Sequence, residues 1–501
     1  MTCLLGLDVG TSGAKALLIG PLGQVLATAT ESYPLHTPHP LWTEQDPEAW
    51  WEACAKAIRR VLDDGKVQPG DVEGIGLTGQ MHGLVLLDAA GNVVRPAILW
   101  NDQRTADQCR AITQRVGAER ILQLTGNPVL PGFTAPKIAW VAENEPEAFG
   151  RSRHLLLPKD YVRYRLTGEI LSDVSDASGT SLFDVAHRRW SPEMVEAVGV
   201  PRDWLPETHE SPEGSARVSA GGAAATGLQE GTVVAAGAGD QAAGALGVGA
   251  IGVGTGSVSV GTSGVVFAPT REYRSDPAGR LHAFCHAAPG RWHLMGVMLS
   301  AAGSLQWYHD LREGDTFDAL LEEAAGVKPG CEGLLFLPYL TGERTPHADP
   351  LARGAFVGLT IRHRWDHMTR AVLEGVAFGL RDSLELIRAA GDTPARARLT
   401  GGGARSPLWR QILADILGLG LEVPENSEGA AFGAALLAGV ASGVFANVDE
   451  AAEKTVRISE TVGPGPERSV YEDLYQVYRG LYPALRQTFL ALGQGDHASE
   501  V

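Results

Sequence analysis

The sequence predicts an α/β protein built from two similar domains, and three observations lead to this prediction. The chain has 501 residues, more than a single hydrophobic core usually organises. The pentapeptide VGTSG occurs twice, at 9–13 and 260–264, and each copy joins two apolar, strand-like runs. Strand-like and helix-like segments alternate along both halves, which is typical of α/β folds. We therefore expect domains at residues 1–244 and 245–501.

In the first half, residues 46–65 predict an amphipathic helix. Asp46 is a favoured N-cap, Pro47 suits the first helical position, and Gly65 follows the last apolar residue. A second helix is expected to end at Gly168. Apolar runs predict strands at residues 3–8, 16–20, 73–79, 83–88, 153–157 and 232–239.

In the second half, the segments that flank the second VGTSG copy are expected to be strands. A strand at 395–400 runs into the turn Gly401-Gly402-Gly403, and Ser406 followed by Pro407 opens a helix. Helical periodicity predicts helices at residues 367–387, 406–418 and 430–443.

Composition and charge exclude several classes of protein. The formal net charge is −17 and no basic stripe is visible, so we expect no nucleic-acid partner. Residues 241–270 carry no charge, but their eight glycines and turn-like GTGS and GTSG argue for a buried Gly-rich segment over a membrane span. The five scattered cysteines fit reduced thiols, and the opening residues resemble no export signal. These features predict a cytoplasmic protein with no membrane partner.

The two Gly-Thr-Ser turns are candidate phosphate-binding loops. Backbone N–H groups of a tight glycine turn can converge on one point, and the hydroxyl groups add further donors. The candidates are Gly10, Thr11 and Ser12 in the first loop and Gly261, Thr262 and Ser263 in the second. A single such turn is more often a plain hairpin, but two copies in two domains could hold one polyphosphate from both sides.

Two aspartates stand where strands end. Asp8 directly precedes the first loop. If that loop binds phosphate, a cation must lie between the phosphate and the Asp8 carboxylate, and Mg²⁺ held through water is suited to this role. The alternative is that Asp8 is solvated or caps a turn. Asp240 precedes a helix, so it is either the N-cap of that helix or a general base for phosphoryl transfer.

Two further groups are weaker signals. Gly401, Gly402 and Gly403, followed by Ser406, lie between a strand and a helix, where a nucleotide could approach the backbone. Gln80, Met81 and His82 follow another strand, and a histidine there would more often be structural.

These residues belong to blocks that resemble the FGGY carbohydrate kinases nearly end to end, and within that family the bacterial xylulokinases. The blocks are GLDVGTSGAK (6–15), LWTEQDPE (41–48), GQMHG (79–83), AILWNDQR (97–104), PGFTAPK (131–137), LLPKDY (156–161), SDVSDASGT (172–180), GDQAAGALGVG (239–249), LPYLTGERTPH (337–347) and TGGGARSPLWRQILADI (400–416).

The resemblance implies two actin/hexokinase-like, ribonuclease-H-type domains that flank an active-site cleft. It also implies ATP-dependent, Mg²⁺-dependent phosphorylation of a ketopentose, and D-xylulose is the first choice of substrate. By position, Asp240 matches the catalytic base and Asp8 the carboxylate near the metal. The other implied assignments are sugar contacts at Gln80, Met81, His82 and Gln241, second-tier sugar candidates Trp100, Asn101 and Asp102, phosphate loops at Gly10, Thr11, Ser12, Gly261, Thr262 and Ser263, and an adenosine site at Gly401, Gly402, Gly403 and Ser406.

Some alternatives stay open. Gln241 stands where xylulokinases usually carry Asn, which leaves ribulose, L-xylulose or glycerol as other acceptors. A non-catalytic sugar or nucleotide sensor on the same fold is the alternative from a different class. The resemblance to the family makes a homodimer possible.

Overall fold

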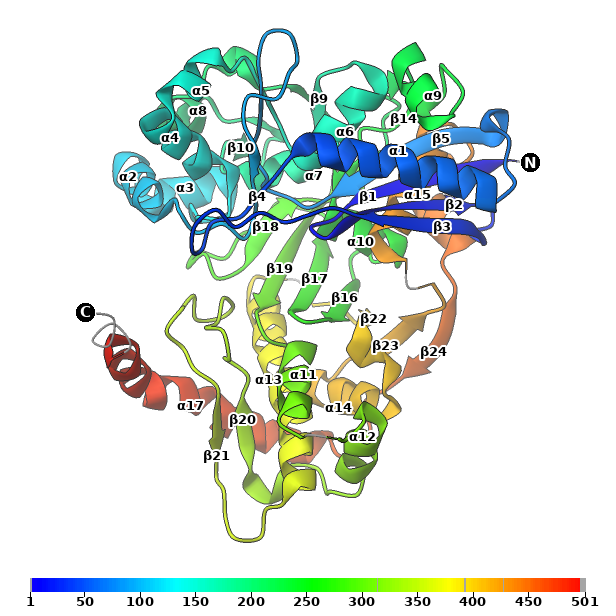
Figure 1. Cartoon of the computed structure of the whole chain (residues 1–501). Coiled ribbons are helices and arrows are strands. Elements are labelled where there is room, and N and C mark those ends of the chain that lie inside the picture. Colours follow the sequence, from blue (N-terminus) through cyan, green and yellow to red (C-terminus); the bar gives the residue numbers. More distant parts are fainter. Residues whose placement is uncertain (1, 313, 392, 427, 496–501) are drawn as a thin grey trace.

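The computed structural model describes residues 2–312, 314–391, 393–426 and 428–495, which form two lobes, each around a seven-stranded sheet (Figure 1). The sheet of the first lobe has the order β13-β14-β5-β1-β2-β3, with β15 also paired to β5. Its strands are β1 (Cys3–Val9), β2 (Gly13–Ile19), β3 (Val25–Ser32), β5 (Val72–Gly79), β13 (Ala216–Arg217), β14 (Val233–Val234) and β15 (Ala238–Gly239).

The sheet of the second lobe repeats this core. Its order is β18-β19-β17-β16-β22-β23-β24. The hairpin β16–β17 corresponds to β1–β2, and β22 runs parallel to β16 as β5 runs parallel to β1. The strands are β16 (Thr255–Val260), β17 (Gly264–Thr270), β18 (His282–Cys285), β19 (Trp292–Met298), β22 (Arg396–Thr400), β23 (Gly420–Pro424) and β24 (Ile458–Val462). The two hairpins are those that the repeated VGTSG predicted.

Helix α1 (Pro47–Asp64) packs on β2 and β3, on the outer face of the first sheet. Asp46 caps it by accepting a hydrogen bond from the Glu48 N–H at 3.0 Å, as predicted. The apolar face of this amphipathic helix is buried, namely Trp50, Trp51, Cys54, Ile58, Val61 and Leu62. Two more helices, α6 (Pro158–Thr167) and α9 (Ala220–Thr226), pack beside α1, and α6 ends at Gly168 in the left-handed conformation.

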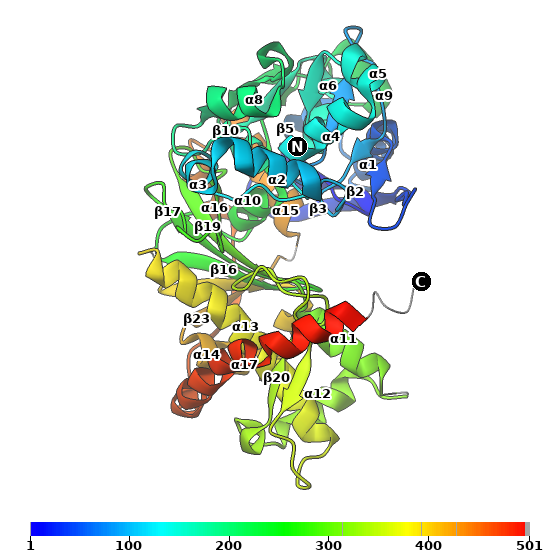
Figure 2. The same ribbon diagram turned by 90° about the vertical axis from the view of Figure 1, so that its left-hand side faces the viewer.

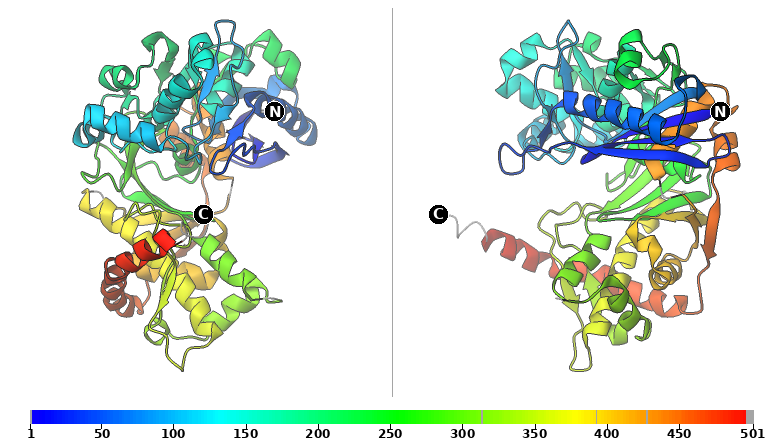
Figure 3. Two further views of the ribbon diagram at one scale, coloured as in Figure 1. Left: turned by 60° about the vertical axis from the view of Figure 1, so that its left-hand side comes forward. Right: turned by 45° about the vertical axis from the view of Figure 1, so that its right-hand side comes forward.

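The inner face of the first sheet is covered by a helix from the far end of the sequence. Helix α15 (Gly429–Ala441) packs on β1 and β5 and against α10 (Asp240–Gly247) (Figure 3). This approach requires glycine, because a Cβ on Gly6 would lie 2.0 Å from the Ala431 carbonyl oxygen and one on Gly76 would lie 1.9 Å from that of Ala434. Helix α16 (Val448–Thr455) follows on the same side.

A mostly helical insertion completes the first lobe beside the sheet (Figure 2). Its helices are α2 (Ala106–Val116), α3 (Ala118–Thr125), α4 (Thr134–Asn144), α5 (Pro146–Arg151), α7 (Val174–Ala177) and α8 (Pro192–Val198). Its short strands pair as β4 (Glu44–Gln45) with β7 (Ala97–Ile98), β6 (Val85–Leu87) with β8 (His154–Leu156), β9 (Leu171–Asp173) with β12 (Glu207–His209), and β10 (Phe183–Asp184) with β11 (Arg189–Trp190).

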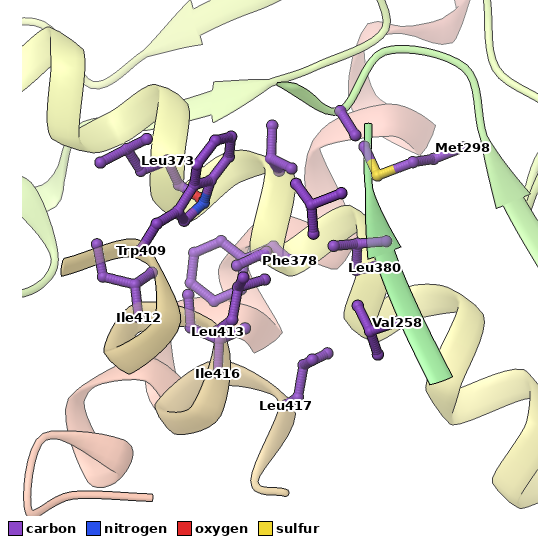
Figure 4. Close-up of a cluster of buried hydrophobic side chains, with 14 of the residues drawn as sticks. Val258, Met298, Leu373, Phe378, Leu380, Trp409, Ile412, Leu413, Ile416 and Leu417 are labelled. Carbon is purple, nitrogen blue, oxygen red and sulfur yellow. The ribbon is translucent and has the colours of Figure 1, made fainter. Parts of the chain in front are cut away.

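The core of the second lobe lies between its sheet and two helices, α13 (Trp365–Ala389) and α14 (Pro407–Leu417). Figure 4 shows Trp409 of α14 beside Leu373 of α13, and the Trp409 indole N–H donates to the Leu373 carbonyl at 3.1 Å. Ser406 caps α14, as predicted. The remaining elements are α11 (Ala302–Asp310), α12 (Phe317–Ala325), β20 (Leu335–Leu337), β21 (Ala355–Val357) and α17 (Arg468–Gly495).

Two strand predictions need correction. The run 232–239 is not one strand: it forms β14 and β15, separated by Gly237 at a φ of 87°. The run 83–88 forms the shorter β6. None of the helices in the described residues is both long and apolar enough to cross a membrane.

Candidate active site

Asp8 and Asp240 lie at the carboxyl ends of parallel strands on either side of β5. Asp8 pairs in register with Thr78, which also pairs with Ala238, and Asp240 follows β15 directly. Asp240 is the first helical residue of α10, while Gly239 is the N-cap, so the carboxyl of Asp240 does not cap this helix. Both aspartates line one cavity of about 360 Å³.

Both lobes contribute to this cavity. The first lobe supplies Gly10 of the first loop and Gln241, and the second supplies Gly401. The first residues of α15 also line it. Because the N-terminal ends of helices carry unpaired N–H groups and a partial positive charge, the opening of α15 favours phosphate in this cavity. The other lining residues are Gly244, Ala245, Val248, Ser257, Ser259, Val265, Phe267, Thr400, Asn426, Gly429 and Ala430.

The electrostatics of the two carboxyls suit proton acceptance. Burial, and after it the charge of Asp8, raises the pKa of Asp240 to about 7, while Gln241 opposes the shift. Burial raises the pKa of Asp8 to about 6, against the field of Lys15, its register partner on β2. A carboxyl with a pKa near the working pH has the driving force that general-base catalysis requires.

A buried network fixes the backbone before Asp240. The Gly239 N–H donates to Ser175 Oγ at 3.1 Å, and Ser175 donates to Asp173 at 2.6 Å. Asp173 pairs with the buried Lys159 at 2.7 Å. Sequence reasoning did not assign Ser175, Asp173 or Lys159 to the site, although they belong to the LLPKDY and SDVSDASGT blocks that carry the resemblance.

The first Gly-Thr-Ser loop is held by side chains of its own lobe. The Thr11 hydroxyl donates to Gln80 Oε1 at 3.2 Å and accepts from the Trp100 indole at 2.9 Å. Gln45 donates to the Thr11 carbonyl at 2.7 Å, and Tyr33 donates to the Gly10 carbonyl at 2.5 Å. Gln80 and Trp100 therefore hold the Thr11 hydroxyl in place. Sequence reasoning assigned neither Gln45 nor Tyr33 to the site, although Gln45 belongs to the LWTEQDPE block; Tyr33 lies outside the blocks that carry the resemblance. Ser12 is exposed at the tip of the turn.

Met81 and His82 contact the backbone of two neighbouring segments, Met81 at Gly239 and His82 at Gly179. Met81 packs on the backbone before Asp240, since a Cβ on Gly239 would lie 2.9 Å from the Met81 sulfur. His82 has a φ of 69°, stacks on Phe133 at 4.3 Å, and its Nδ1 lies 2.6 Å from the Gly179 carbonyl oxygen. Because a carbonyl oxygen only accepts, His82 carries its proton on Nδ1 and offers Nε2 as an acceptor. Burial lowers the pKa of His82 to about 3, so the ring is neutral.

Asn101 and Asp102 both form hydrogen bonds with Thr43. Asn101 accepts from the Thr43 hydroxyl at 2.8 Å. The carboxylate of Asp102 is fully buried, and its oxygens accept from Arg104 at 2.7 Å and from the Thr43 N–H at 2.7 Å. Asp102 thus pairs with a buried arginine inside the insertion, and we do not retain it as a sugar-contacting residue.

The second loop and the triple-glycine turn lie side by side. A Cβ on Gly401 would lie 2.5 Å from the Val260 carbonyl oxygen, next to Gly261. The Ala301 N–H donates to the Thr262 carbonyl at 2.8 Å, which ties the loop to the start of α11. Ser263 is exposed.

A larger cavity, of about 1070 Å³, opens beside this turn. The predicted residues that line it are Gly261, Thr262, Gly402, Gly403 and Ser406. Gly401 lines the smaller cavity instead, so the turn separates the two spaces.

No group of three or more His, Cys, Asp or Glu residues in the described part of the chain could hold a metal by itself. Mg²⁺ keeps several waters and commonly takes one or two carboxylates plus substrate phosphates, so the Asp8 carboxylate, which lines the smaller cavity, fits such an ion.

The comparisons with known proteins agree with this geometry. Residues 3–247 match the N-terminal domain of the FGGY family of carbohydrate kinases, and residues 256–442 match its C-terminal domain. The chain belongs to the FGGY family of carbohydrate kinases. It is a sugar kinase, and such kinases use ATP.

Two curated relatives and one solved structure show which members of this family the chain is similar to. The kinase is 45% identical to a xylulose kinase of Escherichia coli (strain K12), over 96% of this chain and 99% of that one. It is 40% identical to a xylulose kinase of Bacillus subtilis (strain 168), over 98% and 99%. The crystal structure of a xylulose kinase from Brucella ovis matches with a TM-score of 0.91 and 43% identity, over 97% of this chain and 100% of that one.

Proposed function

We propose that the kinase transfers the γ-phosphoryl group of ATP to the terminal hydroxyl of D-xylulose, giving D-xylulose 5-phosphate and ADP. The observation that supports this most directly is the cavity between the lobes, in which Asp8 and Asp240 meet the first loop and the start of α15. D-xylulose is proposed as the acceptor because the relatives described above are named xylulose kinases. The division into domains at residues 244 and 245, the cytoplasmic location and a homodimer remain part of the proposal.

In this mechanism Asp240 accepts the proton of the terminal hydroxyl while that oxygen attacks the γ-phosphorus in line with the leaving ADP oxygen. The bond between the γ-phosphorus and the bridging oxygen breaks, and its electron pair leaves on ADP. Met81 and His82 orient the sugar so that this hydroxyl faces Asp240. Mg²⁺, when bound, neutralises the charge that develops on the phosphate oxygens.

The two loops and the helix start hold the phosphates from both lobes. Closure of the lobes would exclude water, the competing acceptor in any kinase, and would bring the reacting atoms to attack distance.

A panel of acceptors tests the proposal. ADP release with Mg²⁺-ATP would be measured against D-xylulose, D-ribulose, L-ribulose, L-xylulose, glycerol and no sugar. The expected result is the highest kcat/KM on D-xylulose. Preference for another polyol would leave the proposed phosphoryl transfer intact but would refute D-xylulose as the acceptor. Gln241 would then be the first residue to re-examine. No sugar-stimulated ADP release at all would favour a sensor.

A further inference from the structure

Asn426 carries a buried hydrogen-bond donor without a partner in the part of the chain that the structure describes. Its Nδ2 is shielded from solvent, and no atom of residues 2–312, 314–391, 393–426 or 428–495 accepts a hydrogen bond from it. Because a buried amide donor without an acceptor is costly, an unpaired one in a folded protein needs a reason. A ligand that completes the missing bond is such a reason.

The other end of the same amide is fixed. Asn426 lies between β23 and α15, and its Oδ1 accepts from the Glu428 N–H at 2.8 Å. This is the hydrogen bond of an Asx turn, in which an Asn or Asp oxygen bonds the backbone two residues further on. Since a backbone N–H can only donate, the atom that accepts from it is the amide oxygen. The amide nitrogen, with its two hydrogens, remains available for another partner.

Asn426 lines the smaller cavity, together with Asp8 and Asp240. Gly429 and Ala430, the first residues of α15, line it as well. The opening N–H groups of a helix have no acceptor within the helix, so they and the Asn426 amide can donate to one ligand. Among the described residues of this lining, Asn426 is the one whose side chain holds a buried polar atom without a partner.

The charges of this lining make uncharged donors important. Its only ionisable groups, among the residues described, are the two carboxyls, and it contains neither Lys nor Arg. Lys15, which pairs in register with Asp8, is itself bound to Glu428 at 2.6 Å. Phosphate oxygens in this cavity therefore depend on N–H and O–H donors and on a metal ion. A side-chain amide supplies such a donor without adding a charge.

On the proposed function, we infer that the Asn426 side-chain amide donates to a phosphate oxygen of the bound ATP. Asn426 thereby helps to hold the phosphates in the cavity of the two carboxyls. It takes no part in binding the nucleoside, which occupies the larger cavity, because Asn426 does not line that cavity. If Asn426 served only to turn the chain into α15, Asp would replace it without loss, since Asp forms the same turn.

Calorimetry on Asn426→Asp, Asn426→Ala and wild type tests this role, with Mg²⁺ and without sugar. The probes are AMP-PNP, a non-hydrolysable ATP analogue, and adenosine, which has no phosphate. Asn426→Asp keeps the acceptor of the turn but loses the donor and adds a negative charge, whereas Asn426→Ala removes the whole amide. Because a hydrogen bond to a charged group is lost, both variants should bind AMP-PNP about 10- to 100-fold more weakly, and adenosine within about 2-fold of wild type. Wild-type affinity for AMP-PNP in either variant, or an equal loss for adenosine, would overturn the inference.

A matched control separates a local effect from the effect of an added charge. Asn447 is exposed and caps α16 by accepting from the Glu450 N–H at 3.0 Å. Asn447→Asp makes the same exchange outside the cavity, so its affinity for AMP-PNP should match wild type. Thermal unfolding of Asn426→Asp should also match wild type, because the turn is kept. If Asn426→Ala does not fold, Asn426→Asp alone decides.

The proposed function is tested separately, because the binding measurement needs no acceptor sugar. A wild-type enzyme that binds AMP-PNP but does not turn over D-xylulose would refute the proposed function and leave the role of Asn426 standing. An active wild type, with unchanged AMP-PNP affinity in the Asn426 variants, would refute only the role of Asn426.

Discussion

Asp8 and Asp240 flank β5 at the carboxyl ends of their strands, and the charge of one affects the proton affinity of the other. After burial, Asp8 is the largest contribution that raises the pKa of Asp240 to about 7. Since the arrangement follows from the pairing of β1, β5 and β15, the fold itself sets the proton affinity of the proposed base.

The pH dependence of the reaction should reflect this coupling. A general base works when ionised, so kcat/KM should fall about tenfold per pH unit below a pKa near 7. Asp8→Asn removes a negative neighbour, which lowers the pKa of Asp240 and should move this acid limb to lower pH, measured on the residual activity. An acid limb that stays in place, or moves to higher pH, would contradict the coupling.

Packing of α15 on the first sheet should be sensitive to Gly76. Gly76→Ala places a methyl group 1.9 Å from the Ala434 carbonyl oxygen, so the helix must shift. We expect a loss of about 1–3 kcal/mol in the free energy of unfolding, measured with denaturant. Gly150→Ala in α5 is the matched control, because a Cβ added there would meet no atom within 4 Å, and stability should be unchanged or slightly raised. Equal stability of the two variants would contradict this packing.

Asp102 should matter for stability and not for sugar binding. Asp102→Ala leaves Arg104 buried with Glu44 as its remaining carboxylate partner at 2.7 Å. Loss of one partner of a buried ion pair typically costs about 3–5 kcal/mol, which denaturant unfolding would measure. The KM for D-xylulose should be unchanged at temperatures where the variant stays folded. Normal stability together with a tenfold higher KM would return Asp102 to the sugar site.

The sequence predicted local structure better than the placement of side chains. The hairpins, the cap of α1 at Asp46 and the cap of α14 at Ser406 follow from chemistry within a few residues. A helix was also expected at 430–443, where α15 (Gly429–Ala441) lies. An apolar, Ala-rich pattern does not say which sheet such a helix covers, and only the structure places it on Gly6 and Gly76.

The candidate site shows the same limit. Met81 packs on Gly239, the residue before Asp240, because β5 and β15 are neighbours. Asp102 stood in a motif near the sugar residues, but a buried pair with Arg104 is set by three-dimensional packing that residue types do not reveal. The roles of the individual site residues remain predictions.

The most direct test of the proposed mechanism is kcat of Asp240→Asn on saturating D-xylulose and Mg²⁺-ATP, together with the affinity of the variant for ADP. Loss of a positioned general base predicts a kcat about 10²- to 10⁴-fold below wild type. ADP affinity should be unchanged, because Asp240 does not line the larger cavity that we propose for the nucleoside. A variant that kept more than about a tenth of the wild-type kcat would show that Asp240 is not the base.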